Sequence, residues 1–120
     1  MVEPSLTTAQ TRDPNRVYRT IAGRTILFDG EGFIWDPSDW TESLAEVLAK
    51  ESGLEVMGEL HWRVLRFLRE FYSNYGRAPL NKQLKEGTGL SLRELEALFP
   101  GGIKNGARRL AGLPNPKTCV

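Results

Sequence analysis

The residue with the most reactive chemistry in this chain is Cys119, the single cysteine among 120 residues, which stands next to last. Cysteine is usually among the most buried residue types, whereas chain ends are usually solvated. One cysteine excludes a disulfide within the chain and a metal site built from several thiolates. The position therefore leaves two interpretations open: an incidental surface thiol, or a thiol that reacts with an external partner.

Three basic side chains are candidates to support this thiol. Lys117 is two residues away, and Lys104 and Arg108 share one face of a predicted helix through their four-residue spacing. Nearby cations lower the pKa of a thiol and so favour the reactive thiolate, while the terminal carboxylate acts in the opposite sense. The alternative is an ordinary solvated basic cluster near the C-terminal end of a helix.

The overall charge gives no general indication of a nucleic-acid or membrane-surface protein, because 16 basic residues against 15 acidic ones leave a formal charge of +1. The charge is unevenly spread, however. Residues 36–59 hold seven acids and one base, and residues 101–120 hold four bases and no acid. No apolar run has the length of a signal peptide or a membrane span. We therefore expect one cytoplasmic domain, in a compartment where an exposed thiol stays reduced.

The thiol lies on a proline-containing segment. Pro114 and Pro116 cannot continue a helix and favour an extended backbone. Cys119 lies seven positions after Gly112, which gives a reach of about 20 Å at roughly 3.1 Å per residue. Residues 113–120 are accordingly predicted to form a mobile arm, so that truncation after Gly112 is expected to leave folding intact.

The N-terminal part is predicted to hold a tail and a β-hairpin. Residues 1–19 are polar, without apolar periodicity, and are expected to be a disordered tail before a domain over residues 20–112. The β-prone runs 24–28 and 32–35 flank Asp-Gly-Glu, and Asp-Gly between apolar runs indicates a hairpin. Since two strands alone are marginally stable, the hairpin must pack on helices.

The remainder reads as helical. Asp36 followed by proline is a helix start signal, and Ser91 with Glu94 is a capping box. Gly112 is the expected C-cap of the last helix, whose inward side would carry Ala107, Leu110 and Ala111. The predicted helices cover residues 36–52, 58–75, 80–86, 91–98 and 103–111.

The pair of short helices at 80–86 and 91–98 also resembles a helix-turn-helix, which raises DNA binding as an alternative function. The second helix of the pair carries two acids against one arginine, an unfavourable composition for approaching phosphates. Failure to bind duplex DNA in a salt-dependent way would exclude this alternative.

Other side chains with chemical potential have simpler interpretations. The single histidine, His61, lies beside a tryptophan on the predicted central helix, so a hydrogen-bonded structural role is favoured over a general base. Asp29, Glu31 and Asp36 suggest a cation site, but an acidic loop surface explains them as well. No spacing supports a serine–histidine–aspartate arrangement.

Four motifs occur in an order that resembles the DsrC/TusE family over residues 24–120. The resemblance rests on GFIWDPSDWT at 32–41, HW at 61–62 followed by RFLREFY at 66–72, LFPGG at 98–102, and AGLPNPKTCV at 111–120. It implies a mainly α (α+β) fold, a small orthogonal helical bundle with an N-terminal β-hairpin, a helix-turn-helix-like pair and a flexible C-terminal arm.

The resemblance also implies that Cys119 carries sulfur as a persulfide, without a metal or organic cofactor. In DsrC a second cysteine lies eleven positions upstream, where this chain has Arg108. The chain therefore looks like the TusE-type branch, which takes sulfur from a TusBCD-like complex and passes it toward an MnmA-like tRNA thiolase. The alternative is a DsrC-like gamma subunit that docks on a sulfite reductase without the second cysteine.

Overall fold

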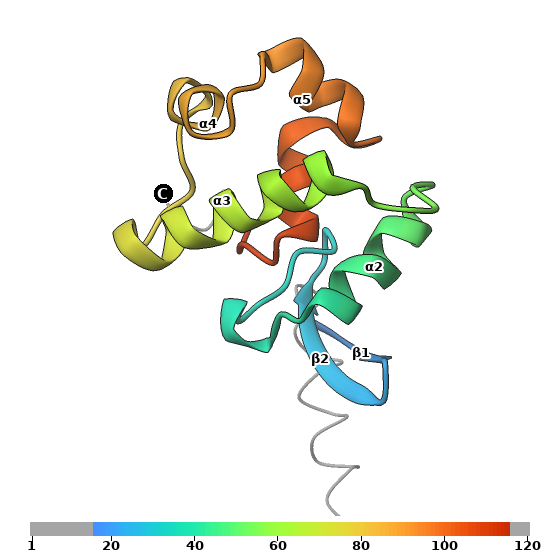
Figure 1. Cartoon of the computed structure of the whole chain (residues 1–120). Helices are drawn as coiled ribbons and strands as arrows, with labels where there is room; N and C mark the ends of the chain where they lie inside the picture. The colour runs from blue at the N-terminus through green and yellow to red at the C-terminus, as the bar shows by residue number, and fades with distance from the viewer. Residues whose placement is uncertain (1–15, 116–120) are drawn as a thin grey trace, which may run out of the picture.

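The computed structural model describes residues 16–115 as a helical bundle with a two-stranded antiparallel sheet at its N-terminal side (Figure 1). The mainly α fold with a hairpin is thereby confirmed. The elements are β1 (Arg16–Ile21), β2 (Arg24–Asp29), the 3-10 turn η1 (Pro37–Asp39), α2 (Glu42–Glu51), α3 (Glu59–Tyr75), α4 (Asn81–Thr88), α5 (Leu92–Leu98) and the π-helical η2 (Gly102–Arg108).

The hairpin joins different residues from those predicted. β1 pairs with β2 across a turn at Ala22 and Gly23, both with positive φ. The predicted strand at 32–35 contributes only the isolated bridge between Phe28 and Ile34. The Ala-Gly turn gave no sequence signal, because alanine rarely adopts positive φ. Residues 16–19, predicted as tail, belong to β1; the rest of that tail lies outside the described residues.

The helix predicted over 36–52 is divided in two. Asp36 caps η1 by accepting hydrogen bonds from the Ser38 backbone and side chain, which hold the pKa of its carboxyl below the usual range. Trp40 then adopts an extended backbone, and α2 begins after Thr41, whose hydroxyl accepts from the Leu44 amide. The break lets the Trp40 ring turn inward, where its indole donates to a backbone carbonyl 70 positions away.

The central helix α3 was predicted correctly in position and type. It starts after Gly58 and ends at Gly76, which has a φ of 72°. Its buried side chains are Val64, Leu65, Leu68 and Phe71. The predicted apolar stripe was longer: its last member, Tyr75, is 64% exposed because the helix end projects beyond the bundle.

The helix-turn-helix-like pair consists of α4 and α5, separated by a short turn at Gly89. The capping box is confirmed, since the Ser91 hydroxyl accepts from the Glu94 amide and the Glu94 carboxylate accepts from the Ser91 amide. In Figure 1 the pair lies on the side of α3 away from the hairpin.

The last helix differs from prediction in its winding. η2 is π-helical and passes into a short α-helical end before Gly112, whose φ is 75° as expected of a C-cap. The glycines of this region allow close packing: a Cβ on Gly106 would lie 2.7 Å from the Cβ of Phe99. The predicted inward side is confirmed, since Ala107, Leu110 and Ala111 are fully buried.

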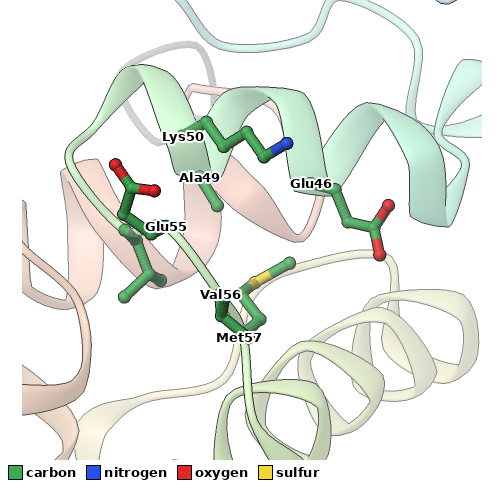
Figure 2. A pocket seen from close by; sticks show the side chains of 7 residues that line it. Glu46, Ala49, Lys50, Glu55, Val56 and Met57 are labelled. Atoms are coloured by element: carbon green, nitrogen blue, oxygen red, sulfur yellow. The ribbon is translucent and has the colours of Figure 1, made fainter.

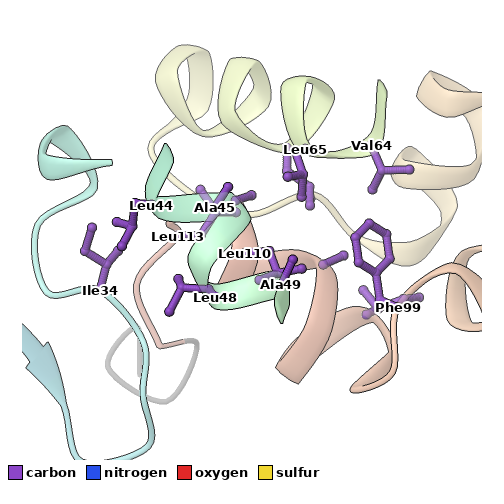
Figure 3. Close-up of a cluster of buried hydrophobic side chains, with 14 of the residues drawn as sticks. Ile34, Leu44, Ala45, Leu48, Ala49, Val64, Leu65, Phe99, Leu110 and Leu113 are labelled. Carbon is purple, nitrogen blue, oxygen red and sulfur yellow. The ribbon is translucent and has the colours of Figure 1, made fainter. Parts of the chain in front are cut away.

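One apolar core contains residues from both strands and from every helix after η1. Figure 3 shows buried side chains of α2, of α3, and of the C-terminal helix and the residues after it gathered in one cluster. The members labelled there include Leu48 from α2, Leu65 from α3, and Leu110 and Leu113 from the C-terminal part. Among the helices within residues 16–115, none has the length and apolarity needed to cross a membrane.

Candidate functional site

The described structure ends four positions before the predicted reactive residue. Cys119 and Lys117 lie outside the described residues, which stop at Asn115. What the structure describes is the origin of the segment that carries the thiol. We call residues 111–115 the arm base, because they are the last described residues before the segment that carries the thiol in the sequence.

The arm base is first fixed by Trp40. The indole Nε1 donates to the Leu110 carbonyl at 2.8 Å. Two residues further on, Gly112 packs on the indole so closely that an added Cβ would lie 2.7 Å from Trp40 Cγ. The positive φ of Gly112 excludes most other residues on backbone grounds as well. Position 112 therefore requires glycine for two independent reasons.

Arg69 of α3 is the second support of the arm base. Its Nη1 donates to the Ala111 carbonyl at 2.9 Å, and its Nη2 donates to the Pro37 carbonyl at 3.1 Å. The guanidinium lies over the Trp40 ring, 4.3 Å from the centroid. Burial lowers the pKa of this guanidinium, yet an arginine remains charged at neutral pH. A single cation thus joins α3, η1 and the arm base.

After Gly112 the arm base stays buried in the molecule. Leu113 is 1% exposed and belongs to the core, and Asn115 is 4% exposed. The Asn115 side-chain amide donates to Asp29 Oδ2 at 2.9 Å. Residues 113–115 are therefore packed, and the prediction of a mobile arm starting at residue 113 is wrong for them. The rest of that predicted arm lies outside the described residues.

Pro114 separates two hollows. The first, of about 170 Å³, is lined by Asp29, Ile34, Trp35, Pro114 and Asn115. The second, of about 200 Å³, lies on the α3–α4 side and is mainly apolar; its walls are Tyr72, Arg77, Ala78, Pro79, Leu80, Arg108, Leu113 and Pro114. The last described residues of the chain thus lie between a hairpin-side hollow and a helix-side hollow.

The structure brings together the two predicted supporting residues that it describes. Lys104 and Arg108 line one open concavity, as their four-residue spacing predicted. Arg108 also borders the helix-side hollow, and its Nη2 donates to the Pro79 carbonyl at 3.1 Å. One of the two predicted cations therefore lies at the arm base. The effect of either residue on Cys119 stays a prediction.

The remaining basic residue after Gly101, Arg109, has a different role. Arg109 donates from Nε to the Asn105 carbonyl and from Nη2 to the Ser52 hydroxyl, so it ties η2 to the end of α2. Burial lowers the pKa of its guanidinium, with opposing smaller influences from Glu51 and Arg19.

His61 has both ring nitrogens engaged. Nδ1 accepts from the Gly58 amide at 3.0 Å and is therefore unprotonated. Nε2 faces the Leu98 carbonyl at 2.9 Å, and since a carbonyl only accepts, Nε2 carries the proton. The neutral imidazole thus caps α3 and joins it to the end of α5, which agrees with the structural interpretation of this histidine.

The acidic loop residues are occupied by backbone groups. Asp29 Oδ1 accepts from the Glu31 and Phe33 amides, each at 2.9 Å, and Asp36 caps η1. Within residues 16–115 no group of three His, Cys, Asp or Glu side chains has an arrangement that could hold a metal ion.

A further hollow, of about 250 Å³, lies away from the arm base, between α2 and the loop after it (Figure 2). Its walls carry charged and apolar side chains side by side: Glu46, Ala49, Lys50, Leu54, Glu55, Val56 and Met57. None of these side chains belongs to the arm base, so this hollow is separate from the candidate site.

Sequence reasoning missed the residues that hold the arm base: Trp40 and Arg69 were assigned no such role, and the Asp29–Asn115 bond was not foreseen. Arg69 carried a usable signal, because it follows Leu68 on the buried side of α3, where an arginine needs polar partners. The Asp29–Asn115 bond had none, because it joins residues 86 positions apart.

Comparisons with known proteins agree with this architecture. The family described as "DsrC like protein" matches residues 20–120. The sulfurtransferase TusE of Pectobacterium atrosepticum is 37% identical over 105 residues, covering 82% of this chain and 95% of that protein. The gamma subunit of the dissimilatory-type sulfite reductase of Nitratidesulfovibrio vulgaris is 34% identical over 101 residues, covering 84% and 96%.

Solved structures give the same result. A crystal structure of dissimilatory sulfite reductase I contains a chain with a TM-score of 0.80 and 32% identity, covering 87% of this chain and 100% of that chain. The oxidized gamma subunit from Archaeoglobus fulgidus has a TM-score of 0.74 at 33% identity, with coverage of 87% and 100%.

Proposed function

Because the chain belongs to the DsrC-like family, we propose that it is a sulfur carrier that accepts and donates persulfide sulfur on Cys119. Relatives named TusE and sulfite reductase gamma subunit support the sulfur-carrier role. The observation that carries the residue assignment is the extent of the family match: it runs through residue 120 and so includes the only cysteine of the chain.

The proposed step is thiol–persulfide exchange. The Cys119 thiolate attacks the outer sulfur of a donor persulfide, a new S–S bond forms, and the old S–S bond breaks. The donor leaves as a thiolate with the electron pair of the broken bond, and the proton stays on the transferred sulfur. Donation to an acceptor thiolate repeats the same exchange in reverse roles, so no external oxidant or reductant is needed.

We further propose the TusE-type route, with a TusBCD-like donor complex and an MnmA-like tRNA thiolase as acceptor, in the cytoplasm. The support is Arg108, which stands where DsrC has its second cysteine. Its guanidinium is hydrogen-bonded to the Pro79 carbonyl. Without a second thiol the chain cannot close a disulfide on itself, so sulfur must leave Cys119 for another molecule.

A second candidate is docking on a sulfite reductase as a gamma subunit. The specific support is the gamma-subunit relative and the sulfite reductase crystal structure that contains a matching chain. Co-purification of the full chain with a siroheme protein would favour this role over tRNA thiolation.

Reconstitution tests the function. The full chain, a cysteine desulfurase with cysteine, a TusBCD-like complex and an MnmA-like enzyme with tRNA are combined, and 2-thiouridine is measured after tRNA digestion. We expect thiolation to depend on the chain and to be lost in Cys119→Ser. Thiolation that proceeds equally with the serine variant would refute the proposal, whereas a chain loaded with sulfur but inactive in thiolation would redirect it to another acceptor.

A further inference from the structure

We propose that the outer edge of β1 is an interaction surface for a second copy of this chain, which pairs with it antiparallel and joins two hairpins into one four-stranded sheet. This is β-strand addition, in which an exposed sheet edge binds an extended strand through backbone hydrogen bonds. The pairing uses neither Cys119 nor the arm base, so it can hold or fail independently of the sulfur-carrier proposal.

The outer edge of β1 offers backbone groups for such a pairing. β1 pairs only with β2 in the two-stranded sheet, across the turn at 22–23, where positive φ at both residues is typical of type I′. Ile21 and Arg24 beside this turn form a hydrogen-bonded pair, and bonded and non-bonded pairs alternate along the ladder. Tyr18 and Thr20 therefore direct their N–H and C=O groups away from β2. Within residues 16–115 neither has a backbone hydrogen bond to any segment other than β2.

The same edge carries exposed apolar side chains. Val17 is 43% exposed and Tyr18 is 36% exposed. They lie on opposite faces of the sheet, because Val17 pairs with the buried Phe28 and Tyr18 pairs with Leu27. Native edge strands are usually protected from pairing by a proline, a bulge or charged side chains. β1 has no proline, and its register with β2 has no bulge.

The two charged side chains of β1 contact groups of their own chain. Arg19 forms an ion pair with Glu51, and its guanidinium lies over the Phe28 ring, 5.4 Å from the centroid. The Arg16 guanidinium lies over the Trp35 ring, 5.0 Å from the centroid. These contacts direct both guanidinium groups over the faces of the chain's own hairpin. The charges that could protect the edge therefore do not extend across it.

β1 is complementary to itself about a two-fold axis at Tyr18. Antiparallel pairing about this axis places Tyr18 opposite Tyr18 of the second copy, and Thr20 opposite Arg16. Val17 then lies opposite Arg19, whose aliphatic stem covers apolar surface. No like charges are opposed in this register, whereas an axis at Arg19 would oppose two arginines. The chain thus supplies its own matching strand, which gives the symmetric interface that most homodimers use.

Pairing also compensates for the small size of the sheet. A two-stranded sheet alone is marginally stable, and the second copy extends it to four strands. Because β1 has only six residues, the interface lies at the small end of the range for specific complexes. We therefore expect weak, reversible dimerisation, with a dissociation constant of about 0.1–1 mM.

The test is sedimentation equilibrium of the full-length protein at concentrations from about 10 μM to about 1 mM, chosen to span the expected dissociation constant. A thiol reductant is present, so that Cys119 cannot link two chains through a disulfide. We expect a monomer–dimer equilibrium for the wild-type chain.

Substitutions at the two-fold axis test the register. Tyr18→Glu and Tyr18→Lys each oppose two like charges at the axis, so each should raise the dissociation constant about tenfold or more. An equimolar mixture of the two variants should restore dimers, because glutamate then lies opposite lysine. Tyr75→Glu is the matched control: it makes the same change at a 64% exposed position of α3 and should leave dimerisation unchanged.

A further variant covers the case in which the charged variants fail to fold. Tyr18→Pro removes one outward amide without removing a hydrogen bond to β2, and should also abolish dimerisation. A wild-type chain that stays monomeric up to about 1 mM would overturn the proposal. So would dimers that persist in the folded Tyr18 variants, or a mixture that stays monomeric. Dimers that form only after deletion of residues 1–15 would show that the chain's own N-terminal residues occupy the edge, and would likewise reject the second copy as its partner.

Discussion

Two hollows on this molecule are of comparable size but are built in different ways. The hollow between α2 and the loop after it, which we call the α2 hollow, takes all its walls from one short stretch, residues 46–57. The hairpin-side hollow combines residues 29–35 with residues 114 and 115, which meet only through folding. The shape of a hollow made by one local stretch follows from the course of that stretch alone. A hollow whose walls include the hydrogen-bonded pair Asp29 and Asn115, 86 positions apart, shows where the fold fixes the last described residues of the chain.

The arm base also differs from the α2 hollow in how little it tolerates change. The Trp40 ring packs closely against Gly112 and lies under the Arg69 guanidinium, whereas Val56 in the α2 hollow is 78% exposed. Substitutions and truncations in the two regions test this difference, from the largest expected effect to the smallest.

Gly112→Ala should destabilise the protein by about 2–4 kcal/mol, since it combines a clash with the Trp40 ring and a strained positive φ. Denaturant unfolding monitored by circular dichroism measures the change. Gly53→Ala is the matched control, because φ is 96° there but nothing lies within 4 Å of the added Cβ. Equal losses for the two variants would mean that Trp40 does not constrain the arm base.

Arg69→Met should reduce the free energy of unfolding by about 2–3 kcal/mol, because the Ala111 and Pro37 carbonyls lose a charged donor. The same measurement on Arg66→Met, at an exposed position of the same helix, should show less than about 0.5 kcal/mol. Similar effects at positions 66 and 69 would contradict the bridging role of Arg69.

Truncation should distinguish the packed residues of the arm base from the end of the chain. Removing everything after Gly112 deletes Leu113 from the core and should destabilise the protein by about 1.5–3 kcal/mol. Removing only residues 116–120 should leave the unfolding midpoint nearly unchanged. Both truncated proteins lack Cys119 and should accept no sulfur. Equal stability of the two truncated proteins would mean that the arm begins at residue 113, as the sequence alone predicts.

Val56→Ser in the α2 hollow should change stability by less than about 0.5 kcal/mol, because this side chain is mostly exposed. Sulfur loading of Cys119 should also be unaffected. A clear loss of loading with normal stability would show that the α2 hollow contributes to donor recognition, and would remove the functional contrast between the two regions.

The sequence predicted those parts of the fold that local rules determine. The α3 helix, the Ser91–Glu94 capping box and the Gly112 cap follow from periodicity and capping chemistry within a few residues. An N-terminal hairpin was predicted correctly, but its strand pairing was predicted wrongly, because the Asp-Gly signal is local whereas the partner of β2 is β1.

The candidate site also contains both residues whose placement follows from local rules and residues that only the tertiary fold brings together. Lys104 and Arg108 share a concavity because helical spacing places them there. Trp40 bonds to Leu110 over 70 positions of the chain, and Arg69 bonds to Ala111 over 42. Asn115 bonds to Asp29 over 86 positions. No local pattern encodes such pairings, since each depends on where the helices cross. The break between η1 and α2 likewise has its reason in the distant bond of Trp40 to Leu110.

The most direct test of the central claim is the intact mass of the full chain after incubation with a persulfide donor and removal of that donor. We predict a gain of one sulfur atom, located on Cys119 by peptide mapping, reversed by a thiol reductant and lost in Cys119→Ser. The same added sulfur in the Cys119→Ser protein, or no added sulfur on a folded wild-type chain, would contradict the assignment of Cys119 as the sulfur carrier.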